Sequence, residues 1–150
     1  MWFCNQQGIQ RNLTDMQSAS FKAETESIHK IQDFVKAELF DKDTVSAKAL
    51  MHVDLVIEEL VVNIVRHGFQ DQTKGAIYVK SRSDGNRLYI RISDNGIPFS
   101  PLEAKPPDIE AAITEREPGG LGLFMVKQVA EQIDYTREED RNRLDIVIKL

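Results

Sequence analysis

Apolar residues recur at helical spacing in two segments of the first half of the chain. Between residues 27 and 40 they lie three or four positions apart, which predicts an amphipathic helix; these residues are Ile28, Ile31, Val35 and Leu39. A second helix is predicted from about residue 46 to residue 67, ahead of Gly68, a residue suited to the left-handed geometry that closes helices. Apolar residues cover most of this second helix, so we expect it to be buried.

Shorter apolar segments predict strands. The first covers residues 18–23, and residues 76–80 and 88–92 are expected to pair as an antiparallel hairpin. Between these two strands lies Asp84-Gly85, a strong signal for a tight turn.

The end of the chain repeats both patterns. A third helix is predicted after Gly120, where apolar residues return to helical spacing at Leu123, Val126, Ala130 and Ile133. Residues 144–150 then alternate as the last strand of a closing hairpin. With its strands in hairpins and its helices clustered, the chain is expected to be an α/β (α+β) two-layer sandwich, with an antiparallel or mixed sheet and the helices on one face.

The same patterns suggest the domain organisation. Residues 1–15 are polar and are expected to be loosely ordered, whereas residues 16–150 are expected to form one domain. A chain of 150 residues with 41% apolar content is long enough for one core of this kind. Residues 94–120 hold all five prolines and are predicted to be mostly loop, with one helical turn near residues 108–115. This segment is expected to be the mobile part of the fold.

Charge and composition exclude several classes of protein. The net charge of −5 and pI near 5.2 argue against a nucleic-acid binder, which needs a basic face. The single cysteine, Cys4, cannot form an internal disulfide, which fits a reducing compartment. No stretch approaches the roughly 20 apolar residues of a membrane span. We therefore expect a soluble, cytoplasmic protein with no membrane or nucleic-acid partner.

The second predicted helix carries a polar stripe within its apolar surface. At about 100° per residue, Glu59, Asn63, Arg66 and His67 fall on one arc. A carboxylate and an amide oxygen four residues apart suit Mg²⁺, which takes oxygen ligands and shares its waters with substrate phosphates. The helix alone fits a structural role equally well, in which Glu59 pairs with a basic residue and Asn63 bonds within the fold.

Two further segments combine glycine with a possible ligand contact. Asp94-Asn95-Gly96-Ile97-Pro98-Phe99 follows a predicted strand, so the Asp94 carboxylate could turn into a pocket and bind adenine; an ordinary Asp-Asn-Gly turn explains it as well. Gly119-Gly120-Leu121-Gly122-Leu123 runs into the third helix, whose free N–H groups could bind phosphates. It is neither a Walker loop nor the dinucleotide fingerprint.

In this order and spacing, the three segments resemble the N box and the two glycine boxes of the GHKL ATPase superfamily. The likeness covers about residues 16–150 and is greatest to the anti-sigma factor serine kinases of the RsbW and SpoIIAB group, which are also short single domains. It implies a Bergerat fold that binds ATP and Mg²⁺ under a flexible lid.

The resemblance also implies roles for individual residues. Glu59 would be the general base, Asn63 the Mg²⁺ ligand and Asp94 the adenine-binding acid. The residues implied to bind the nucleotide are Asn63, Asp94, Gly96, Pro98, Arg116, Gly119, Gly120, Leu121, Gly122 and Leu123. One departure concerns the phosphates: the group often has a basic residue directly before its glycine pair, whereas this chain has Glu117-Pro118 there and Arg116 further back.

The function implied is that of a serine/threonine protein kinase and anti-sigma factor. Its substrate would be a serine on an anti-anti-sigma protein of the STAS type, which competes with a sigma factor, and a homodimer is expected. Two rival hypotheses remain. The chain could hold ATP and switch partners without turnover, or it could be the catalytic domain of a histidine kinase, although it lacks a phosphoacceptor helix pair and His29 and His52 lack suitable neighbours.

Overall fold

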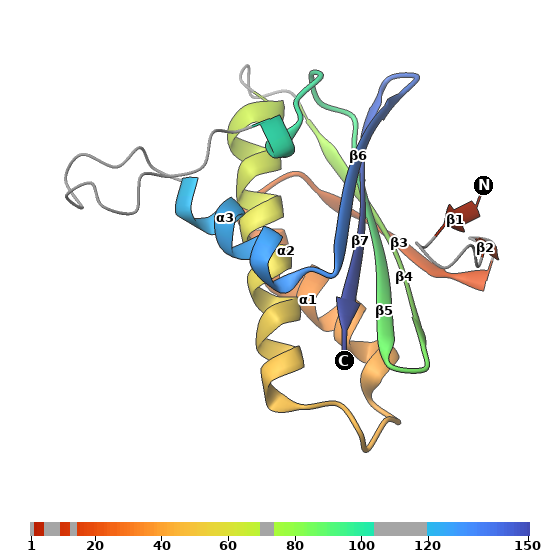
Figure 1. Cartoon of the computed structure of the whole chain (residues 1–150). Helices are drawn as coiled ribbons and strands as arrows, with labels where there is room; N and C mark the ends of the chain where they lie inside the picture. Colours follow the sequence, from red (N-terminus) through yellow and green to blue (C-terminus); the bar gives the residue numbers. More distant parts are fainter. Residues whose placement is uncertain (1, 5–9, 13–14, 70–73, 104–119) are drawn as a thin grey trace.

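A computed structural model describes residues 2–4, 10–12, 15–69, 74–103 and 120–150. Five strands form one sheet in the order β3-β4-β5-β7-β6, with every neighbouring pair antiparallel. They are β3 (Gln17–Lys22), β4 (Ala76–Asp84), β5 (Arg87–Asp94), β6 (Gln132–Glu138) and β7 (Arg141–Lys149). The helices α1 (Ile28–Lys36), α2 (Ala47–Gly68) and α3 (Gly120–Val129) cover one face of this sheet (Figure 1), so the predicted two-layer sandwich is confirmed.

Short elements complete the description. The 3-10 turns whose bounds are described are η2 (Thr25–Ser27), η3 (Ala37–Leu39) and η4 (Pro101–Glu103). Near the N-terminus, β1 (Trp2–Cys4) pairs antiparallel with β2 (Gln10–Asn12), a pairing that the polar sequence did not predict. No helix among the described residues is both long and apolar enough to cross a membrane.

The core lies between the sheet and α2. This helix begins at Ser46, whose hydroxyl accepts a hydrogen bond from the Ala49 N–H at 3.1 Å and so satisfies a free donor of the first turn. Although Met51 is 71% exposed, the apolar side chains of α2 that face the sheet are almost completely buried, as the sequence pattern predicted. From α2 they are Val53, Val56, Ile57, Leu60, Val61 and Ile64, and from the sheet Ile77, Val79, Leu88, Ile90, Ile92, Leu144, Ile146 and Ile148.

The predicted hairpin of β4 and β5 is present, with both strands longer than the sequence suggested. Gly85 occupies its turn with φ of +57°, a backbone conformation that glycine adopts without steric cost. On its other edge β5 pairs with β7, and this register sets Asp94 opposite Asn142. Two residues 48 positions apart therefore meet at the same end of the sheet.

The end of the third helix was predicted wrongly. Helix α3 ends at Val129, so Ala130 follows it and Ile133 belongs to β6. Ile133 and Tyr135 turn their side chains toward the core in strand alternation, and Ile133 also falls on the helical spacing of the preceding residues. A few apolar positions fit both periods, which is why the pattern misplaced the boundary. The helical turn predicted near residues 108–115 lies outside the described residues.

Candidate functional site

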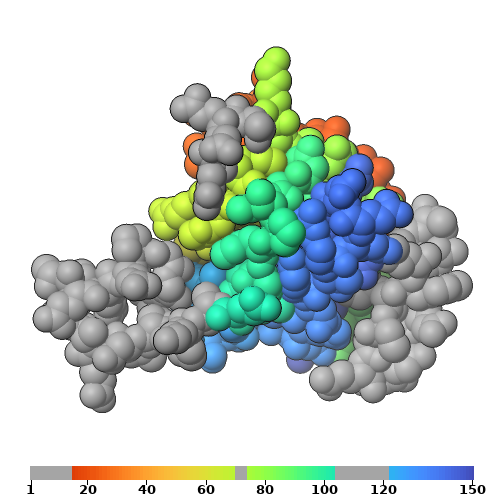
Figure 2. Space-filling model, turned by 90° about the horizontal axis from the view of Figure 1, so that it is seen from above, coloured from red at the N-terminus to blue at the C-terminus, as the bar shows by residue number. Residues whose placement is uncertain are grey.

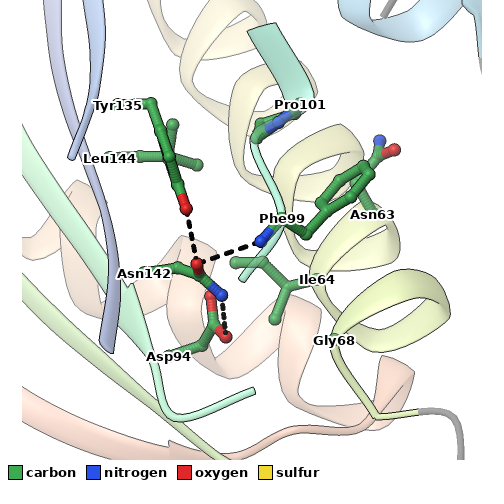
Figure 3. Close-up of a pocket in the computed structure, with 9 residues that line it drawn as sticks. All are labelled: Asn63, Ile64, Gly68, Asp94, Phe99, Pro101, Tyr135, Asn142 and Leu144. Atoms are coloured by element: carbon green, nitrogen blue, oxygen red, sulfur yellow. Dashed lines mark hydrogen bonds between the residues drawn. The ribbon is translucent and has the colours of Figure 1, made fainter. Parts of the chain in front are cut away.

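A small pocket lies where the C-terminal end of α2 meets the end of β5 and the start of β7 (Figure 3). Its free space is about 280 Å³, part of it open to solvent. The close-up shows the α2 side chains on one side, those from the sheet on the other, and Phe99 between them. The lining residues are Asn63, Ile64, Gly68, Asp94, Phe99, Pro101, Tyr135, Asn142 and Leu144.

Asp94 is the buried acid of this pocket, with only 4% of its surface exposed. Its Oδ1 accepts hydrogen bonds from the Gly96 N–H at 2.9 Å and from Asn142 Nδ2 at 3.0 Å. Burial raises the pKa of the Asp94 carboxyl above its ordinary value, and the two hydrogen bonds and the charge of Arg137 oppose that rise. Both bonds end on Oδ1, so Oδ2 can accept a hydrogen bond from a ligand amine.

The loop after β5 packs tightly onto the end of α2. A Cβ at Gly96 would lie 2.6 Å from the Gly68 carbonyl oxygen and 2.9 Å from its Cα, and the Ile97 N–H donates to the same oxygen at 3.1 Å. The rings of His67 and Phe99 stack with 4.5 Å between centroids. Figure 2 shows this loop lying between the end of α2 and the hairpin of β6 and β7. Chain packing at Gly68 is therefore a sufficient reason for glycine at position 96.

Asn142 organises the pocket and was not selected as a site residue from the sequence. Its Nδ2 donates to Asp94 Oδ1 and, at 2.7 Å, to the Ile97 carbonyl oxygen. Its Oδ1 accepts from the Tyr135 hydroxyl at 2.7 Å, from the Phe99 N–H at 3.2 Å and from Arg137 Nη1 at 3.2 Å. The sequence signal was weak, because an asparagine at the start of a strand has many roles. Only the register between β5 and β7 reveals its contacts.

Asn63 lies at the α2 side of the same pocket and is 6% exposed. Its Nδ2 donates to the Glu59 carbonyl oxygen at 2.7 Å, one helical turn back. This bond fixes the orientation of the amide, and its Oδ1, which carries the lone pairs, is the atom that can bind a cation. Among the described residues no three His, Cys, Asp or Glu side chains gather into a metal site. Mg²⁺ fits this arrangement because it often takes one or two protein ligands and completes its shell with water and phosphate.

Glu59 extends from α2 toward α3 and is partly buried, whereas the neighbouring Glu58 is exposed. The Glu59 carboxylate lies against the backbone of Gly122 in the first turn of α3, where a Cβ would overlap it. Burial, and to a lesser extent the charge of Glu58, raise the pKa of Glu59 above its ordinary value, while Arg66 opposes the rise. A carboxylate with a raised pKa is better suited to accept a proton near neutral pH.

The other predicted site residues fall in several places. Gly120 opens α3, as the glycine motif predicted. The Leu123 side chain is 5% exposed and belongs to the core, so a contact with a ligand would have to come from its backbone. Pro98 is exposed and does not line the pocket. Arg116 and Gly119 lie outside the described residues, and the side chain of Leu121 is not described.

Comparison with known proteins gives a consistent set of relatives. The profile of the histidine kinase-like ATPase domain matches residues 21–148. The serine/threonine-protein kinase BtrW of Bordetella bronchiseptica is 28% identical over 105 residues, which cover 70% of this chain and 74% of that protein. The serine-protein kinase RsbW of Listeria monocytogenes is 28% identical over 99 residues, which cover 63% of this chain and 62% of the kinase.

Two further comparisons extend this set. The anti-sigma F factor of Halalkalibacterium halodurans is 24% identical over 89 residues, which cover 59% of this chain and 61% of that protein. Among solved structures, the histidine kinase domain of the blue-light activated kinase EL346 from Erythrobacter litoralis superposes with a TM-score of 0.54 at 18% identity. That match covers 84% of this chain and 60% of the kinase, and at this identity it supports the fold alone.

Proposed function

Because the chain belongs to the family of histidine kinase-like ATPase domains, we propose that it binds Mg-ATP in this pocket and transfers the γ-phosphoryl group to a serine or threonine of a partner protein. The observation that carries the proposal is the meeting of Glu59 with the glycine segment of α3, one turn away from Asn63 on α2. A candidate base, a candidate metal ligand and a helix N-terminus thereby lie together.

Adenine would be recognised at Asp94. Its Oδ1 is held by Gly96 and Asn142, so Oδ2 would accept a hydrogen bond from the exocyclic amine of adenine. A buried acceptor that loses its partner leaves a costly unsatisfied group, so a purine with a carbonyl in place of the amine would bind poorly. The pocket by itself is too small for a whole nucleotide, so the nucleotide would extend beyond it toward α3.

The phosphate end would lie near α3 and Asn63. The free N–H groups in the first turn of α3 would bind phosphate oxygens, which suits an acidic protein. Asn63 would hold Mg²⁺ through Oδ1. When bound, the metal neutralises charge on the phosphates and orients them for in-line attack.

Glu59 would act as the general base. Its carboxylate accepts the proton of the attacking hydroxyl while a bond forms between that oxygen and the γ-phosphorus. The bond from the γ-phosphorus to the bridging oxygen breaks, and the leaving ADP keeps the electron pair. Glu59 suits this role because its partly buried carboxylate has a raised pKa and lies beside the phosphate-binding helix end.

For the partner we propose an anti-anti-sigma protein of the STAS type, with a sigma factor as its competitor and a homodimer as the working form. The support is the names of the relatives, which include serine-protein kinases and an anti-sigma F factor. The chain spans 62% of the Listeria kinase, so the substrate and the assembly belong to the proposal. The net charge of −5 does not favour a nucleic-acid partner, so we propose a protein partner in the cytoplasm.

A second candidate is an ATP-binding module that switches partners without turnover. One observation favours it: Glu117-Pro118 stands where the related kinases often carry a basic residue next to the phosphates. Loss of that positive charge would weaken stabilisation of the transferring group more than it weakens binding of the nucleotide.

An experiment with γ-³²P-labelled ATP, Mg²⁺ and purified candidate STAS domains separates the kinase from the module without turnover. The kinase proposal expects phosphoserine or phosphothreonine on one domain and a loss of about 10²- to 10⁴-fold in the transfer rate for Glu59→Gln. Glu58→Gln is the matched control, because it removes an exposed carboxylate one position away whose charge raises the pKa of Glu59 less than burial does, so most of the transfer should remain. ATP binding with no transfer to any candidate supports the module instead.

A further inference from the structure

The family resemblance places Gly122 near the nucleotide, where a glycine would let phosphates approach the backbone. The atoms around Gly122 in the structure suggest a different reason for the absence of a side chain. A Cβ on this residue would overlap the carboxylate of Glu59, whose Oε2 and Cδ are its nearest neighbours and whose Oε1 would lie at 2.8 Å. Outside the local backbone of α3, these three atoms are the closest heavy atoms to that position. The space a side chain would need at Gly122 is therefore filled by the candidate base.

The crowding at Gly122 differs in kind from that at Gly96. At Gly96 two of the three nearest atoms belong to the backbone of Gly68, at the end of a buried helix, and the third is Oδ1 of the buried Asp94. At Gly122 the obstructing atoms are the tip of a flexible side chain, which can rotate away. Alanine at position 122 should therefore leave the fold intact and move the Glu59 carboxylate, and alanine also favours a helix more than glycine does.

We propose that Gly122 is a positioning residue for Glu59, whose carboxylate is held against the first turn of α3 only because position 122 has no side chain. The inference rests on the proposed kinase function, since it assigns a part of the same site. The contact joins α2 to α3, so the placement of the base depends on how these two helices pack.

The usual explanation for a glycine in such a segment is close approach of phosphates to the backbone. The two explanations predict different defects for Gly122→Ala. If the glycine serves the nucleotide, alanine weakens ATP binding whatever residue occupies position 59. If the glycine serves Glu59, ATP binding persists and transfer falls by about 100-fold, the loss expected when a catalytic group moves by about 1 Å.

The test is a cycle of four proteins: wild type, Gly122→Ala, Glu59→Ala and the double variant. Affinity for Mg-ATP is measured by calorimetry in each. We expect Gly122→Ala to change the affinity by no more than about threefold in both backgrounds, the scatter typical of independent sites. A larger loss in both backgrounds would overturn the proposal, because the glycine would then serve the nucleotide.

Rescue by a shorter base provides the second arm. Glu59→Asp withdraws the carboxylate by one methylene from the place of the new Cβ. Gly122→Ala should therefore reduce the transfer rate much less in the Glu59→Asp background than in the wild type. An equal reduction in the two backgrounds would show that the defect does not pass through Glu59.

A third readout does not require kinase activity. The ¹³Cδ resonance of Glu59, assigned by its absence in Glu59→Gln, is compared between the wild type and Gly122→Ala at one fixed pH. A carboxylate displaced from the first turn of α3 changes its surroundings, so its chemical shift should change. An identical resonance in the two proteins would overturn the contact. If the wild type transfers no phosphate to any candidate, the proposed function fails while this comparison still decides the role of Gly122.

Discussion

Replacing Asn142 by alanine removes five hydrogen bonds from the wall of the pocket. The side chain donates to Asp94 and Ile97 and accepts from Phe99, Tyr135 and Arg137. With 4% exposure it is screened from solvent, so water cannot simply replace it.

The loss of stability in Asn142→Ala depends on which hydrogen bonds each partner of Asn142 retains. Asp94 Oδ1 retains the Gly96 N–H but loses a bond to a charged acceptor, which is worth about 1.5–3 kcal/mol. Arg137 still donates to the Gly96 carbonyl oxygen at 3.0 Å, and the carbonyl of the exposed Ile97 can be hydrated. We therefore expect the free energy of unfolding to fall by about 2–4 kcal/mol, less than the sum of five buried bonds. For a chain of this size that lowers the Tm by roughly 5–15 °C.

Thermal and urea unfolding followed by circular dichroism would measure this change. Gln128→Ala is a suitable control, because it removes an exposed amide from α3 and should stay within about 0.5 kcal/mol of the wild type. ATP affinity should also fall in Asn142→Ala. In the wild type the hydrogen bond from Asn142 lowers the pKa of Asp94 and helps orient its carboxylate, and the variant loses both effects. A loss below about 0.5 kcal/mol, with ATP affinity unchanged, would refute the central position assigned to Asn142.

Three other changes test the site. Asn63→Ala should weaken ATP binding measured by calorimetry with Mg²⁺ and leave binding in EDTA unchanged; an equal loss in both would contradict its role as metal ligand. Asp94→Asn should lower ATP affinity at least about tenfold and reduce the preference for adenine over guanine nucleotides. Burial raises the pKa of Asp94, so its ionisation disfavours folding above that pKa. The stability of Asp94→Asn should thus equal or exceed that of the wild type at pH 8, with the difference shrinking as the pH falls through the raised pKa. Gly96→Ala should cost about 1–3 kcal/mol in urea unfolding, because its Cβ meets the Gly68 backbone; unchanged stability would contradict that contact.

Local patterns in the sequence were sufficient for most of the elements. The apolar face of α2 and the turn at Gly85 depend on residues close together in the chain, and such signals act whatever surrounds them. The same is true of the one-turn spacing from Glu59 to Asn63. The end of α3 was misplaced because Ile133 fits both a helix and a strand, and only its pairing with Ile146 in β7 separates the two.

The sequence by itself determined which residues could carry the chemistry, since it supplied a carboxylate, an amide and a glycine segment in a recognisable order. Only the tertiary structure decided which of them meet. The register of β5 and β7 brings Asn142 to Asp94, and the packing of α3 on α2 brings Gly122 to Glu59. Neither contact can be predicted from the periodicity of the sequence, because each joins residues far apart in the chain. The distance between such residues is set by how strands pair and helices pack, not by local spacing.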